Sequence, residues 1–78
     1  MNRIEVLGSG CAKCKALEEK VRRLVAENEL EFQIEKVTDL KEIMKYGILA
    51  TPGLVVNGKV KHSGSIPTDA QILTWLMV

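Results

Sequence analysis

Two cysteines separated by two residues are the side chains of this sequence best suited to chemistry. They are Cys11 and Cys14, and they lie in the segment Gly8-Ser9-Gly10-Cys11-Ala12-Lys13-Cys14. A Cys-x-x-Cys pair supports either dithiol–disulfide exchange or the capture of a soft metal ion. The elements on both sides of the pair, and the second half of the chain, bear on the choice between the two.

The elements next to the cysteines predict different surroundings for the two sulfurs. The segment from Arg3 to Leu7, apolar on both sides of Glu5, is typical of a central strand, and Gly8-Ser9-Gly10 is typical of a tight turn. A helix is then expected from about Cys11 to Glu27. Its apolar stripe consists of Cys14, Leu17, Val21, Leu24 and Val25. Cys11 therefore lies at the start of the helix, whereas Cys14 lies on the face that packs against the rest of the protein.

These positions predict a different role for each cysteine. Unpaired N–H groups and the positive end of the helix dipole surround Cys11, and both favour a thiolate over a thiol. Because the thiolate is the attacking species, Cys11 is the expected nucleophile, and Lys13 adds a nearby positive charge. Cys14 is expected to be shielded and within reach of a mixed disulfide on Cys11, as a resolving cysteine must be.

The middle of the chain predicts a second strand and a short helix. Alternating apolar and polar residues over Leu30 to Glu35 are typical of a half-buried strand. Asp39 and Glu42 match a capping box at the start of a helix, and Gly47 is its expected C-cap. The residues expected on the inner face of this helix are Leu40, Ile43 and Met44.

A hairpin and a final helix complete the chain. Asn57-Gly58 separates Gly53 to Val56 from Val60 to His62, and this dipeptide between β-prone runs is a strong hairpin signal. Thr68 and Gln71 form a second capping box. The residues expected on the inner face of the last helix are Ala70, Leu73, Leu76 and Met77. The resulting order, βαβ then α then ββα, predicts an α/β protein whose first two strands are parallel.

Length and composition limit the classes of function. The 78 residues, 46% of them apolar, are expected to form one domain over residues 1–78. A net charge of +1 gives no electrostatic basis for binding nucleic acid or an anionic membrane. The sequence has no signal-peptide pattern and no stretch near the roughly 20 apolar residues of a membrane span. A soluble, cytoplasmic protein is therefore expected, and in a reducing cytosol such a cysteine pair is more often catalytic or metal-binding than structural.

Two motifs taken together resemble those of a known superfamily. They are Gly10-Cys11-Ala12-Lys13-Cys14-Lys15 and, later in the chain, Thr51-Pro52-Gly53-Leu54-Val55-Val56-Asn57-Gly58-Lys59. With both motifs, the sequence resembles the thioredoxin/glutaredoxin superfamily over essentially its whole length. It looks most like the small prokaryotic thioredoxin-like proteins of the redox-active disulfide type. The resemblance implies a minimal thioredoxin-like fold with a four-stranded mixed sheet in the order 2-1-3-4, flanked by three helices.

The resemblance also implies an activity and roles for further residues. Pro52 would be a cis-proline beside the dithiol and Thr51 the residue that docks substrate, with Gly10, Ala12 and Lys13 on the substrate side of the pair. The implied activity is thiol–disulfide exchange that reduces or exchanges protein disulfides, without a metal or organic cofactor. The partners implied are disulfide-bonded proteins and an upstream disulfide reductase, and the protein is expected to act as a monomer.

The sequence departs from that superfamily near the cysteines. Thioredoxins carry Trp before the first cysteine and Gly-Pro between the two, whereas this chain has Gly10 and Ala12-Lys13. Thioredoxins also use a buried Asp on the preceding strand to move protons, and Glu5 stands at a comparable offset before Cys11. Strand alternation allows Glu5 to face either the dithiol or solvent. The aromatic residue and glutathione contacts of glutaredoxins do not map onto this sequence.

A soft-metal carrier is the competing function. Small copper and zinc chaperone domains also place Cys-x-x-Cys between a first strand and a first helix, and two thiolates suit Cu(I). Those domains usually carry a Met just before the motif, where this chain has Gly10, and their βαββαβ order ends in a strand. Two ligands are also too few for a closed structural zinc site. A thioredoxin-like binding module with vestigial redox activity is a third candidate.

The other distinctive side chains are interpreted as structural. His62 is expected to be a strand residue rather than a base or a metal ligand. Trp75 and Phe32 are expected in the core or at its rim, and Tyr46 in a packing role.

Overall fold

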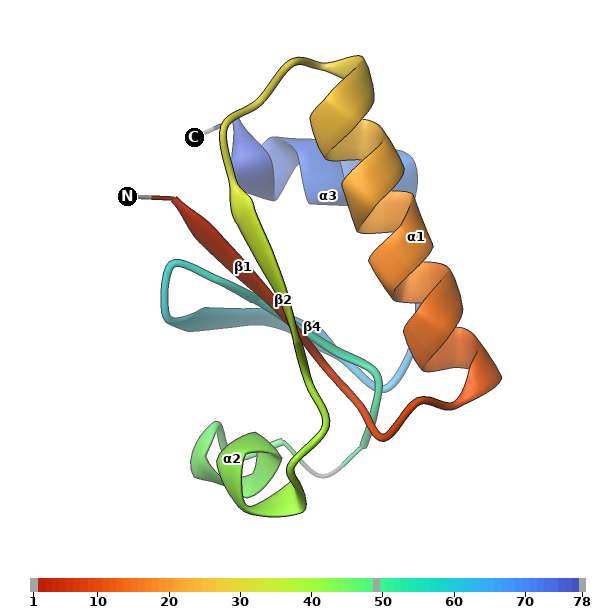
Figure 1. The fold of residues 1–78 in the computed structure, drawn as a ribbon, viewed down its shortest axis with the longest axis vertical. Coiled ribbons are helices and arrows are strands. Elements are labelled where there is room, and N and C mark those ends of the chain that lie inside the picture. The colour runs from red at the N-terminus through yellow and green to blue at the C-terminus, as the bar shows by residue number, and fades with distance from the viewer. Residues whose placement is uncertain (1, 49, 78) are drawn as a thin grey trace.

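Four strands and three helices are formed by residues 2–48 and 50–77, which are the residues described by this computed structural model (Figure 1). They are β1 (Arg3–Leu7), α1 (Ala12–Glu27), β2 (Gln33–Val37), α2 (Leu40–Lys45), β3 (Gly53–Val56), β4 (Lys59–Ser63) and α3 (Asp69–Leu76). Three residues of the expected domain, Met1, Leu49 and Val78, lie outside the described residues.

The four strands form one mixed sheet in the order β2-β1-β3-β4. β1 and β2 are parallel, and β3 is antiparallel to both β1 and β4. The hairpin turn between β3 and β4 is Asn57-Gly58, with positive φ values of 50° and 84°, as this dipeptide predicts. The predicted strand order 2-1-3-4 and the three helices are therefore confirmed.

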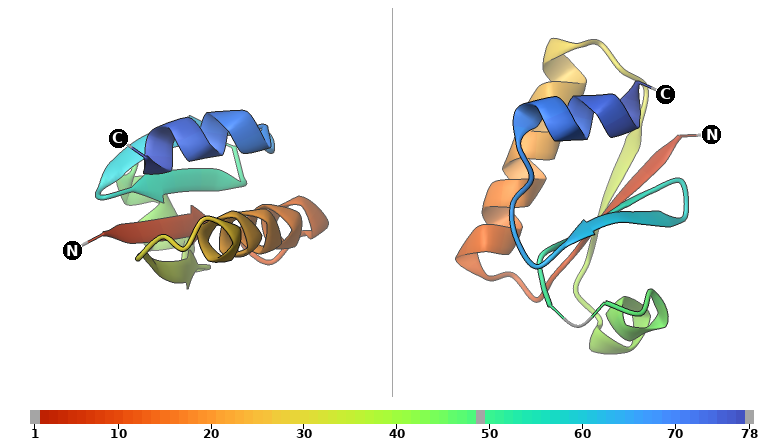
Figure 2. Two further views of the ribbon diagram at one scale, coloured as in Figure 1. Left: turned by 90° about the horizontal axis from the view of Figure 1, so that it is seen from above. Right: turned by 180° about the vertical axis from the view of Figure 1, so that it is seen from behind.

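Helices cover both faces of the sheet. Alternate residues of β1 and β3 point to opposite faces, so each face has its own hydrophobic core under its helices. Figures 1 and 2 show α1 and α3 on one face and α2 on the other. The larger core, under α1 and α3, consists of Ile4, Val6, Leu17, Val21, Leu24, Val25, Leu54, Val56, Ile72 and Leu76. The smaller core, under α2, consists of Leu7, Ile43 and Val55, with Val37, Tyr46 and Ile48 packed against it.

β2 begins later than the sequence pattern predicts, at Gln33 rather than Leu30. The reason is the end of α1, where Glu29 takes a left-handed φ of 51°. The N–H of Leu30 donates to the carbonyl of Val25 at 3.0 Å, and that of Glu29 to Ala26 at 3.3 Å, which is a Schellman motif. Leu30 therefore belongs to the cap of α1 and packs on the larger core before the strand starts.

The inward face predicted for α2 is wrong in two of its three residues. Ile43 is buried, but Leu40 and Met44 are 68% and 65% exposed. Asp39 caps the helix by accepting from the N–H of Lys41, whereas Glu42 pairs with Lys45 instead of completing a capping box. Because the helix has six residues, one narrow stripe of side chains meets the sheet. Ile43 belongs to this stripe, and the next residue of the stripe along the chain is Tyr46, the C-cap that precedes Gly47.

The inward face predicted for α3 is also wrong in part. Leu76 is buried and Leu73 packs partly against the larger core, as predicted, but Ala70 is exposed and Met77 is 61% exposed. Ile72 takes the inward place, because it lies one helical turn before Leu76 on the side that meets α1 and β3. Met77 does not lie on the inner face because it is already the C-cap of α3.

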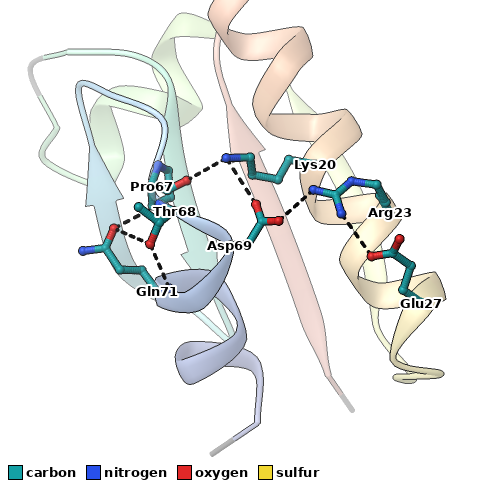
Figure 3. A network of polar contacts seen from close by, with 7 residues as sticks. All are labelled: Lys20, Arg23, Glu27, Pro67, Thr68, Asp69 and Gln71. Carbon is teal, nitrogen blue, oxygen red and sulfur yellow. Dashed lines mark hydrogen bonds and ion pairs between the residues drawn. The ribbon is translucent and has the colours of Figure 1, made fainter.

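Polar contacts hold the start of α3 against the middle of α1 (Figure 3). Lys20 Nζ donates to the carbonyl of Pro67 at 3.1 Å and lies 3.3 Å from the carboxylate of Asp69. The guanidinium of Arg23 donates to Asp69 and to Glu27, both at 3.0 Å. The predicted capping box of α3 is also present, with Thr68 and Gln71 as its two members.

No helix among the described residues has both the length and the apolar character needed to cross a membrane.

Candidate active site

The two cysteines lie at one end of the sheet, where β1 ends and α1 begins. Cys11 is the N-cap of α1, with extended backbone at φ −67° and ψ 166°, and Cys14 lies in the first turn. The backbone N–H of Cys14 donates to Cys11 Sγ at 3.2 Å. A sulfur that accepts one of the unpaired N–H groups at a helix start is stabilised as an anion. The predicted position of Cys11 at the mouth of the helix is confirmed.

The two cysteines differ in exposure. Cys11 is exposed, and Cys14 is buried at 2% exposure, on the same stripe as Leu17 and Val21. They are joined as a disulfide with a Cα–Cα distance of 5.1 Å, within the usual range for this bond. The structure is therefore that of the oxidised pair, with one cysteine exposed and the other buried.

Two lysines lie in the first turn of α1, directly after Cys11. The first turn of α1 is Ala12-Lys13-Cys14-Lys15, and both lysines are exposed. The turn before it contains Gly10, whose φ of 90° needs glycine. Helix dipole, N–H donor and lysine charges all favour an anionic sulfur at Cys11 once the disulfide is reduced.

Gly8 touches the buried sulfur, although the sequence pattern marked it only as part of a turn. A Cβ built on Gly8 would overlap Cys14 Sγ, and it would lie 2.9 Å from Cys14 Cβ and 3.9 Å from Thr51 Cβ. Gly8, Cys14 and Thr51 therefore converge at one point. A glycine directly after a central strand is the one sequence signal that could have drawn attention to this position.

The segment that enters β3 lies beside the dithiol. Leu7 at the end of β1 is paired with Gly53 at the start of β3, which brings Thr51 and Pro52 to the same end of the sheet. The Thr51–Pro52 peptide bond is cis, as the resemblance implied. Thr51 is exposed and Pro52 is buried, and the carbonyl of Pro52 accepts from the N–H of Gly64 at 2.9 Å.

Glu5 faces away from α1. It lies on the face of the sheet that α2 covers, since its neighbours in β1, Ile4 and Val6, point into the larger core under α1. Tyr46 Oη donates to the carboxylate of Glu5, at 2.9 Å from each oxygen, and Arg3 Nε lies 3.8 Å away. This hydrogen bond is the main reason that the pKa of Tyr46 lies above its ordinary value. Glu5 thus anchors α2, and no contact described for it points to the dithiol within residues 2–48 and 50–77.

His62 lies in β4, which β3 separates from β1 and the dithiol. Its Nε2 is 2.7 Å from Ser65 Oγ, and its ring packs against that of Trp75 with centroids 5.9 Å apart. Trp75 and Phe32 are half-buried at the rim of the larger core, as expected. Among the described residues, His, Cys, Asp and Glu side chains form no group of three or more that could hold a metal ion.

The comparisons with known proteins agree with this geometry. The thioredoxin domain family matches residues 2–77. The chain is similar to a thioredoxin of Methanothermobacter thermautotrophicus, with 35% identity over 92% of this chain and 94% of the relative. It is also similar to a thioredoxin of Methanocaldococcus jannaschii, with 35% identity over 88% of this chain and 79% of the relative. The chain therefore belongs to the thioredoxin domain family, and it is a thiol–disulfide oxidoreductase of that family.

Proposed function

We propose that this protein reduces or exchanges disulfide bonds of other proteins, with Cys11 as nucleophile and Cys14 as resolving cysteine. The observation that carries the proposal is the asymmetry of the pair. Cys11 is exposed at the N-cap of α1, and Cys14 is buried one turn along at disulfide distance. An exposed, stabilised thiolate is suited to attack, and a shielded thiol beside it is suited to resolution.

The reaction has two exchange steps. The Cys11 thiolate attacks one sulfur of the substrate disulfide, so that a Cys11–substrate bond forms and the substrate's second sulfur leaves as a thiolate. Cys14 then loses its proton and attacks Cys11 Sγ, which releases the first substrate sulfur. Two electrons have passed to the substrate, and the protein is left with the Cys11–Cys14 disulfide. A disulfide reductase acting upstream returns this pair to the dithiol.

The surface around Cys11 is proposed as the substrate contact. Gly10, Ala12 and Lys13 border Cys11 in the turn and first residues of α1, and Ala12 and Lys13 are exposed. Thr51 reaches the same point from the segment before β3, next to Gly8 and Cys14. We propose that Thr51 and Pro52 dock the substrate chain while it is bonded to Cys11. Residues 1–78 would act as a single domain and as a monomer in the cytoplasm, and the exchange would need no metal or organic cofactor.

Disulfide reduction by single-cysteine variants tests the scheme. Reduction of insulin disulfides with dithiothreitol as electron source should be lost in Cys11→Ser. Cys14→Ser, reduced first and then freed of dithiothreitol, should instead accumulate a mixed disulfide with insulin through Cys11, visible by mass and cleaved by added thiol. Equal and undiminished activity in both variants would exclude the scheme.

Element order argues against the soft-metal carrier. Within residues 2–48 and 50–77, a helix separates β2 from β3 and two consecutive strands follow it, whereas the competing βαββαβ order requires consecutive strands directly after the first helix. Titrating the reduced protein with Cu(I) against a competing chelator separates the two functions. Binding that survives a strong chelator, together with no insulin reduction, would favour the carrier.

A further inference from the structure

Gly8 occupies a position where space, rather than backbone conformation, requires glycine. Its φ lies outside the left-handed region, in contrast to Gly10 at 90° and Gly58 at 84°. It is buried directly after β1, and its N–H donates to the carbonyl of Val37 at 2.9 Å, so the parallel ladder continues to this residue. The backbone at Gly8 is therefore held in place by the sheet and has little freedom to move away from a neighbour.

The neighbour that a side chain at Gly8 would meet is the buried cysteine. An added Cβ would overlap Cys14 Sγ and would stand 2.9 Å from Cys14 Cβ. Nothing lies within 4 Å of a Cβ built on Gly10 or Gly58. Of these three glycines, Gly8 is thus the one whose missing side chain leaves room for the sulfur.

We infer that Gly8 is a positioning residue of the dithiol, which leaves room for Cys14 Sγ where it can bond Cys11 and so favours the disulfide state. This inference rests on the proposed function. In the disulfide, the bond to Cys11 fixes Cys14 Sγ against Gly8. In the dithiol, Cys14 can rotate about χ1 to another staggered position. A methyl group at residue 8 therefore strains the oxidised protein more than the reduced one.

Equilibration with glutathione tests the inference. The protein disulfide and two glutathione thiols give the protein dithiol and one glutathione disulfide, so two electrons and two protons move to the cysteine pair. The oxidised fraction is measured by thiol alkylation and mass spectrometry. Gly8→Ala should shift the equilibrium constant towards the dithiol by about tenfold, the scale of overpacking in a well-packed site. Gly58→Ala, which strains the distant hairpin turn, should leave the constant within about twofold because it affects both redox states alike.

A second pair of variants separates contact with the sulfur from general damage. Cys14→Ala keeps the Cβ but removes the sulfur, so Gly8→Ala should lower the melting temperature less in Cys14→Ala than in the oxidised parent. If Gly8→Ala alone does not fold, the double variant should fold. An unshifted glutathione equilibrium in folded Gly8→Ala, or an equal loss of stability in both backgrounds, would overturn the inference. So would a double variant that also fails to fold.

The inference and the proposed function can fail separately. If the parent reduces insulin but Gly8→Ala does not shift the glutathione equilibrium constant, the role of Gly8 is excluded and the proposed function stands. If Gly8→Ala shifts the constant but the parent does not reduce insulin, the role of Gly8 stands and the proposed function is excluded.

Discussion

Tyr46 Oη lies 2.9 Å from each carboxylate oxygen of Glu5, and this hydrogen bond joins the end of α2 to β1. The side chain of Glu5 is only 12% exposed. Tyr46 is also the C-cap of α2, and the chain passes from it towards Thr51 and Pro52. The bond therefore ties the segment beside the dithiol to the central strand through a short helix that has one buried residue, Ile43.

Replacing Tyr46 with Phe should destabilise the protein by about 1 kcal/mol, because a partly buried carboxylate loses its donor.

The pH dependence of the free energy of unfolding should also change in Tyr46→Phe. The hydrogen bond to Glu5 raises the pKa of Tyr46, so the folded state favours the neutral phenol. That stabilisation is complete below the unfolded pKa of about 10 and is lost as the pH rises above it. Chemical denaturation from pH 7 to 11 should show a steeper alkaline loss in the parent than in Tyr46→Phe. Parallel curves would contradict the role of this bond.

Ile72→Ala should lower the free energy of unfolding by roughly 3 kcal/mol, since it leaves a cavity in the larger core. Met77→Ala should change it by less than about 0.5 kcal/mol, because Met77 is 61% exposed at the end of α3. Urea denaturation of the two variants measures both values. A Met77→Ala loss as large as that of Ile72→Ala would mean that Met77 packs inward in solution.

Local signals in the sequence predicted most elements and the cysteine geometry. Asn57-Gly58 specified the hairpin, Thr68 and Gln71 the start of α3, and the stripe through Cys14 the buried face of α1. Each of these signals depends on residues close together in the chain, and the structure agrees with them. The cis bond before Pro52 was predicted from the resemblance to a family, because no local pattern distinguishes it from a trans bond.

The features that the sequence did not predict depend on contacts between distant elements. α2 has apolar residues on two sides, and the position of the sheet decides that Ile43 and Tyr46 face inward rather than Leu40 and Met44. The sequence pattern alone does not decide which face of the sheet Glu5 lies on, because this depends on how the partner strands and helices are arranged around β1. Gly8 matters because α1 returns Cys14 to its side, which a turn motif does not reveal.

Asp69→Asn should make the free energy of unfolding fall less steeply as the pH is lowered into the acid range. Arg23 is the main reason that the pKa of Asp69 lies below its ordinary value, and the carboxylate also meets Lys20 (Figure 3). A depressed pKa in the folded state gives stability that is present above the unfolded pKa of about 4 and lost as the pH falls through the folded value. The difference between parent and variant should shrink as the pH falls below about 4. Glu19→Gln removes an exposed carboxylate of α1 outside this network, and a difference of the same size there would contradict the assignment.

The helix start stabilises an anionic sulfur at Cys11 while Cys14 stays shielded. This claim is tested by the alkylation rate of each cysteine in the reduced protein as a function of pH. Iodoacetamide labelling, resolved by peptide mass, should show Cys11 reacting at least about tenfold faster than Cys14 at pH 7, with its pH midpoint below the usual thiol value of about 8.5. Equal and slow rates for the two thiols, with midpoints near that usual value, would contradict the claim.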